Sequence, residues 1–106
     1  RLDLAASHYK EVIRAYPHHP LANYDLAVIY QAQGRYDDAI AHYGRAVESF
    51  RNPSDIKDAF MNMGNCFFKK GMMEEAFSSY SEALRISPGD PAALNNLGVL
   101  QMRMGR

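Results

Sequence analysis

Four histidines and one cysteine are the residues of this chain best suited to metal binding or nucleophilic catalysis. His8 and His42 stand 34 residues apart. A metal site needs three or four ligands, and no cysteine or acidic residue recurs with this pair, so we interpret both as surface histidines. His18-His19 lies between two prolines and is expected in a linker. Cys66 has no histidine near it in sequence and is predicted to be a buried structural thiol.

The remaining sequence signals argue against chemistry. The chain has no glycine-rich phosphate loop, no Ser-His-Asp order and no metal signature, so we predict a protein that is not an enzyme, with no catalytic, cofactor-binding or metal-binding residues. Twelve acidic residues balance twelve basic ones, which argues against nucleic acid as a partner. No apolar run reaches the roughly 20 residues that span a bilayer, so we expect no membrane insertion. The single cysteine favours a reducing compartment and a cytoplasmic location.

A pattern of small and aromatic residues recurs along the chain. Gly34, Ala39, Tyr43 and Ala46 are followed 37 residues later by Gly71, Ala76, Tyr80 and Ala83. Parts of the same pattern recur at a spacing of 34 on either side, as Ala5 and Tyr9 and as Gly105. A repeat of this length indicates one supersecondary unit that stacks on copies of itself.

Helical periodicity indicates six helices and no strand. They are expected at residues 3–16, 21–33, 36–50, 54–71, 73–86 and 91–104. Glycines or prolines end most of these segments, since proline cannot continue a helix interior and glycine accepts a left-handed C′ position. We expect Ser54 or Asp55 to cap the fourth helix, and Asp90 followed by Pro91 to begin the last one. The fold class is therefore all-α with short polar turns.

These residues resemble the tetratricopeptide repeat, a family of about 34-residue helix–turn–helix units. Leu26-Ala27, Met63-Gly64 and Leu97-Gly98 match its pairs of a large and a small residue, where the small one lets the partner helix approach. The resemblance implies a right-handed α-solenoid of antiparallel helix pairs, cut from a longer array. It divides residues 1–106 into the second helix of a truncated repeat (1–19), two full repeats (20–53 and 54–90) and the first helix of another truncated repeat (91–106). Three extra residues precede Lys57, so we expect a longer helix or loop around residues 50–54.

Members of this family line a concave groove with the first helix of each pair. The resemblance places Asn62 and Asn96 at the same groove position of adjacent repeats, with Asp25 in the repeat before. Amides that carry donors and acceptors can pair with any peptide backbone, and the row resembles the asparagine ladder of O-linked N-acetylglucosamine transferase. The alternative is that these side chains are simply solvated. The expected peptide-binding residues are Tyr24, Asp25, Val28, Met61, Asn62, Asn65, Phe68, Lys69, Asn95, Asn96, Val99 and Arg103.

The resemblance therefore implies a protein–protein interaction scaffold that binds a peptide segment of a partner protein. Chaperone-binding members clamp a terminal carboxylate with basic residues. At one of these clamp positions the three successive repeats of this chain carry Tyr24, Met61 and Asn95, none of them basic, so we expect no chaperone C-terminal tail as a partner. Two alternatives remain. The segment is the substrate-targeting arm of a larger enzyme such as a glycosyltransferase, or it self-assembles head to tail. In the second case, residues 104–106 of one copy followed by residues 2–5 of another rebuild the order of residues 34–39.

Overall fold

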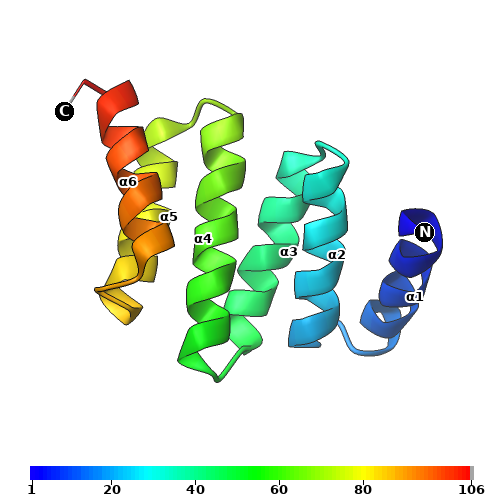
Figure 1. Ribbon diagram of the computed structural model, residues 1–106. Coiled ribbons are helices and arrows are strands. Elements are labelled where there is room, and N and C mark those ends of the chain that lie inside the picture. The colour runs from blue at the N-terminus through cyan, green and yellow to red at the C-terminus, as the bar shows by residue number, and fades with distance from the viewer. Residues whose placement is uncertain (106) are drawn as a thin grey trace.

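The structure, a computed structural model, describes residues 1–105, and this part of the chain forms six helices and no strand. Each helix packs against the next one along the chain, so that α1 and α6 lie at opposite ends of a row (Figure 1). The prediction of an all-α fold with six helices is confirmed. Arg106, the last residue of the expected final segment, lies outside the described residues. The helices are α1 (Leu2–Ala15), α2 (Pro20–Ala32), α3 (Tyr36–Ser49), α4 (Pro53–Lys69), α5 (Met73–Ile86) and α6 (Pro91–Arg103).

Glycine ends α2 and α4 as the sequence predicts. Gly34 has φ +75° and Gly71 has φ +79°, a region that side chains with a Cβ rarely adopt. The reversal lets the amide of Arg35 donate to the carbonyl of Tyr30 at 2.8 Å, a bond that satisfies one of the carbonyls left open at the end of α2. These two tight turns direct α3 and α5 back along the helices that precede them.

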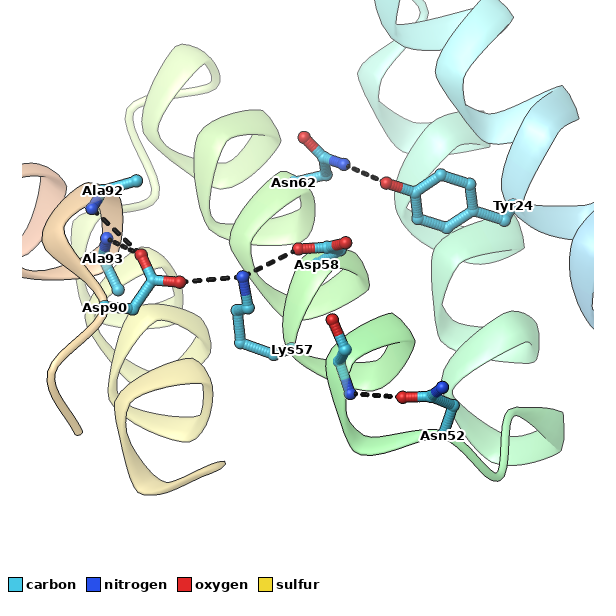
Figure 2. A network of polar contacts seen from close by, with 9 residues as sticks. Tyr24, Asn52, Lys57, Asp58, Asn62, Asp90, Ala92 and Ala93 are labelled. Atoms are coloured by element: carbon cyan, nitrogen blue, oxygen red, sulfur yellow. Dashed lines mark hydrogen bonds and ion pairs between the residues drawn. The ribbon is translucent and has the colours of Figure 1, made fainter. Parts of the chain in front are cut away.

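The cap expected at Ser54 or Asp55 is wrong, whereas the longer helix expected around residues 50–54 is confirmed. The third helix ends at Ser49 instead of residue 50, and α4 begins at Pro53 instead of Ser54 or Asp55. The cap is Asn52, whose Oδ1 accepts a hydrogen bond from the amide of Ser54 at 2.8 Å (Figure 2). Pro53 then occupies the first helical position, where its missing N–H costs nothing. The insertion thus lengthens α4 to 17 residues.

His19 and His42 also differ from expectation. His19 caps α2, because its Nδ1 accepts from the amide of Ala22 at 3.1 Å, so it belongs to a helix start and is not mere linker. His42 is half-buried, and its Nδ1 lies 2.9 Å from Oδ1 of the fully buried Asn23. The Asn23 amide nitrogen already donates to the carbonyls of Pro17 and His19, so His42 is the donor in this contact.

The repeated small residues lie in the core. Ala39, Ala46, Ala76 and Ala83 are completely buried. At Gly64 an added Cβ would lie 2.5 Å from Cε1 of Tyr80, so only glycine lets α5 come this close to α4. Close packing of this kind fixes the spacing between neighbouring helices, and with it the position of the side chains on their exposed faces.

Candidate functional site

Two open cavities lie along α2, α4 and α6 and share Asn65 and Asn96. The first, of about 330 Å³, we call the amide cavity. Residues on α4 three or four apart lie on one helix face, which brings Asn65, Phe68 and Lys69 to the same wall. Asn96 and Val99 on α6 form the opposite wall in the same way. The complete lining is Gln31, Asn65, Phe68, Lys69, Tyr80, Asn96 and Val99.

Hydrogen bonds fix the amide side chains of this cavity. The Tyr80 hydroxyl donates to Asn65 Oδ1 at 2.5 Å, and Asn96 Nδ2 donates to the same oxygen at 3.3 Å. Burial raises the pKa of Tyr80 to about 12, so its hydroxyl keeps its proton at neutral pH. Within residues 1–105, the Asn65 Nδ2 and the Asn96 Oδ1 have no hydrogen-bond partner. The cavity therefore presents one unused amide donor and one unused amide acceptor.

Apolar and basic groups border the amides. Phe68 and Val99 contribute apolar surface to the lining. The guanidinium of Arg103 lies 5.5 Å from the centre of the Phe68 ring, a cation–π arrangement. Lys69 also lines the cavity, and neither it nor Arg103 forms an ion pair with any of the described residues. This side of the cavity therefore carries two cations that are available to a ligand.

The second cavity, of about 310 Å³, lies nearer the start of α4, and apart from the shared Asn65 and Asn96 several of its polar groups are paired with one another. Asn62 Nδ2 donates to the Tyr24 hydroxyl at 2.8 Å and so links α4 to α2 (Figure 2). Lys57 Nζ lies 2.7 Å from Asp90 and 3.0 Å from Asp58. The lining is Tyr24, Lys57, Asp58, Met61, Asn62, Asn65, Asp90, Ala92 and Asn96.

Asp90 has two functions in this network. It accepts from the amides of Ala92 at 2.9 Å and Ala93 at 3.1 Å, which caps α6 as predicted, and it also faces Lys57 across the cavity (Figure 2). The hydrogen bond from Lys57, followed by that from Ala93, lowers the pKa of Asp90. The same contact raises the pKa of Lys57. Asp90 thus connects α4 to the start of α6, the two helices that form opposite walls of the second cavity.

The structure brings together most of the predicted groove residues but not all of them. Asp25, Val28 and Asn95 lie outside both cavities. The charge of Asp25 instead acts on Tyr9 of α1, whose pKa it raises. Arg103 contacts the site only through Phe68. The predicted residues that line a cavity are Tyr24, Met61, Asn62, Asn65, Phe68, Lys69, Asn96 and Val99.

The groove residues expected from the sequence do not include Tyr80, Lys57 or Asp90. The ring of Tyr80 is buried, but its hydroxyl reaches the amide cavity. A buried tyrosine usually finds a hydrogen-bond partner, and this is the signal that could have placed it at the site. Because the Lys57–Asp90 contact joins residues 33 positions apart, no local sequence pattern predicts it.

The cysteine and the histidines, which were considered for catalysis or metal binding, line neither of these cavities. Cys66 is completely buried, and burial raises the pKa of its thiol to about 11, so the thiol is protonated and unreactive at neutral pH. Within residues 1–105, no three His, Cys, Asp or Glu side chains gather in a way that could hold a metal ion. Across the same residues, none of the helices has the length and apolar character needed to cross a membrane.

Antiparallel helices stacked in a row, with a groove along alternate members, define an α-solenoid built from helical hairpins. The sequence profile of the tetratricopeptide repeat family matches residues 1–52 and 24–91. The chain belongs to this family.

Relatives of this chain are longer proteins. Tetratricopeptide repeat protein 16 of Homo sapiens is 31% identical over 105 residues, which are 98% of this chain and 12% of that protein. Photosystem I assembly protein Ycf3 of Synechococcus sp. (strain CC9605) is 30% identical over 76 residues, 72% of this chain and 44% of Ycf3. The chain thus spans less than half the length of either relative.

Solved structures share the fold. The first TPR of Spaghetti (RPAP3), bound to HSP90 peptide SRMEEVD, superposes with a TM-score of 0.88 and 24% identity, covering 99% of this chain and 81% of that one. BtubC from P. vanneervenii gives a TM-score of 0.87 and 20% identity, covering 99% of this chain and 50% of that one. The predicted solenoid of helix pairs is confirmed.

Proposed function

We propose that this segment is a protein-interaction scaffold that binds an extended peptide of a partner protein in the amide cavity. The observation that carries the proposal is the unused donor of Asn65 beside the unused acceptor of Asn96. An extended peptide backbone offers a carbonyl and an amide in alternation, so it complements such a pair. Each bond of this kind contributes about 0.5–1.5 kcal/mol net.

The border of the cavity suggests which side chains the peptide carries. Phe68 and Val99 favour an apolar side chain in the space of about 330 Å³. Lys69 and Arg103 favour an acidic residue next to it, because both cations lack an ion-pair partner among the described residues. We therefore expect an internal peptide segment with an apolar residue followed or preceded by aspartate or glutamate.

A chaperone tail is not the expected ligand. The similar domain of RPAP3 was solved with an HSP90 peptide, and proteins with a tetratricopeptide fold can thus bind peptides. In this chain, however, the positions that resemble the basic clamp hold Tyr24, Met61 and Asn95. The amides of Asn65 and Asn96 are suited to a peptide backbone, and the cations beside them, Lys69 and Arg103, do not stand at those clamp positions.

The experiment begins with a peptide selected from a displayed library on the immobilised chain and measured by calorimetry. Asn96→Ala removes the proposed acceptor, and Asn95→Ala is its matched control, an exposed asparagine one residue away that lines neither cavity. We expect Asn96→Ala to weaken the selected peptide about tenfold, equivalent to about 1.4 kcal/mol. Asn95→Ala should leave the affinity unchanged.

The two variants separate the proposal from its alternatives. Equal affinity of both variants and the parent chain would show that the peptide does not use the amide cavity. Weakening by Asn95→Ala alone would move the site to the exposed face of α6, as the family groove positions predict for that residue. The unfolding curves of both variants, measured in parallel, should match the parent because neither side chain is fully buried.

A further inference from the structure

The two cavities form one continuous groove along α4, because both are lined by Asn65 and Asn96. Within α4, Asp58, Asn62, Asn65 and Lys69 follow one another at spacings of four, three and four residues. Such spacings place all four side chains on one face of the helix. The helix axis advances by about 16 Å over this row. The groove therefore has an aspartate in its second cavity and a lysine at the far end of its amide cavity.

Asp58 is the carboxylate of the second cavity that remains open to a ligand. Its side chain is 49% exposed, and Lys57 is its one ion-pair partner among residues 1–105. Asp90, by contrast, is 13% exposed, pairs with Lys57 at 2.7 Å and accepts from two backbone amides at the start of α6. Lys57 itself is held between these two carboxylates (Figure 2).

The charge of the groove changes sign along α4. The lining of the second cavity contains one lysine and two aspartates, so this cavity carries a net negative charge. Burial, followed by the charge of Asp58, raises the pKa of the Tyr24 hydroxyl in this cavity, and the carboxylates of Asp25 and Asp55 act in the same direction. The charged residue that lines the amide cavity is Lys69, which has no ion-pair partner in the described part of the chain.

We propose, building on the peptide-binding function proposed above, that the groove selects a peptide with a basic residue at Asp58 and an acidic residue at Lys69. An extended peptide advances about 3.3 Å per residue, so a span of about 16 Å places these two charged residues about five positions apart. The apolar residue that fits the amide cavity lies between them or beside the acidic one. Asp58 is thus a specificity-determining residue, because a peptide that is acidic throughout meets a carboxylate there.

The test begins with random peptides displayed on phage and selected on the immobilised parent chain. The selected peptides should carry lysine or arginine about five positions from aspartate or glutamate. Asp58→Lys should weaken such a peptide about fivefold in calorimetry, and Asp58→Asn should weaken it less. Glu48→Lys is the matched control, because it makes the same charge change at an exposed residue of α3 that lines neither cavity, and it should leave the affinity unchanged.

A charge exchange separates recognition from a structural effect of the substitution. A peptide whose basic residue is replaced by glutamate should bind the parent chain more weakly and recover its affinity on Asp58→Lys. A variant that had merely lost its fold would bind neither peptide, and circular dichroism checks the fold directly.

The outcomes distinguish this proposal from the one on which it rests. Selected peptides without a basic residue, unchanged affinity for Asp58→Lys, or a charge exchange without recovery would each overturn the proposed selectivity. If Asn96→Ala still weakens the same peptides, binding in the amide cavity stands and only the selectivity is refuted. Peptides that respond to neither variant, or the recovery of no peptide at all, would overturn both proposals.

Discussion

Replacing Gly64 by Ala should destabilise the fold and disturb the amide cavity together. The new Cβ would lie 2.5 Å from Cε1 and 2.7 Å from Cδ1 of Tyr80, a ring that is only 2% exposed. The equivalent pair in the preceding repeat is Ala27 and Tyr43, where the hydroxyl donates to Gln31 at 2.6 Å. The residue equivalent to Gln31 in α4 is Phe68, which offers no acceptor. A displaced Tyr80 hydroxyl would thus lose its bond to Asn65 without gaining another.

The expected magnitude follows from three contributions. Overpacking in a well-packed core costs about 1–3 kcal/mol. Loss of one hydrogen bond costs about 0.5–1.5 kcal/mol. Alanine regains about 0.5–1 kcal/mol of helix preference over glycine. The free energy of unfolding should therefore fall by about 2 kcal/mol, which for a small domain moves the urea midpoint by about 1 M.

Urea unfolding followed by far-ultraviolet circular dichroism measures this change. Gly98→Ala is the matched control, because its Cβ would meet no atom within 4 Å and only the helix preference remains. It should raise the free energy of unfolding by about 0.5–1 kcal/mol when measured in dilute solution. A Gly64→Ala chain as stable as the parent would refute the reasoning about close packing. Unchanged affinity for the selected peptide would refute the link from Gly64 to the cavity.

Two further substitutions test the polar contacts through thermal or urea unfolding. His42→Ala leaves the buried oxygen of Asn23 without a donor and should cost about 1–3 kcal/mol, whereas the exposed His8→Ala should change stability by less than about 0.5 kcal/mol. Burial, and then the charge of Arg45, lowers the pKa of His42 below 6.5, so stability should fall with pH below about 6.5 in the parent chain and less in His42→Ala. Asp90→Asn keeps a helix cap but removes the charge that faces Lys57, so the variant should be less stable near neutral pH. Since the pKa of Asp90 is lowered from 3.8, this difference should disappear as the pH falls through and below about 4, and persistence in acid would contradict the assignment.

Local chemistry determines how far the sequence predicted this fold. The turn after Gly34 and the cap at Asp90 depend on residues only a few positions apart, and both were predicted correctly. The start of α4 was not, because Asn52, Ser54 and Asp55 can all cap a helix and local preference does not choose among them. The burial of His42 was also missed. It depends on Asn23, 19 residues away on another helix, and no local pattern reports such a contact.

The candidate site shows the same limit within the repeat itself. Asn62 and Asn96 occupy one repeat position, which led to the expectation of equivalent functions. Their neighbours make them different: Asn62 donates to Tyr24 of the preceding repeat at 2.8 Å, whereas Asn96 donates to Asn65 at 3.3 Å. Asn96 lines both cavities beside the unused amide nitrogen of Asn65, whereas Asn62 lines only the second one. Identical residues at one repeat position therefore need not bind alike, because the side chain that each one meets belongs to the repeat before it.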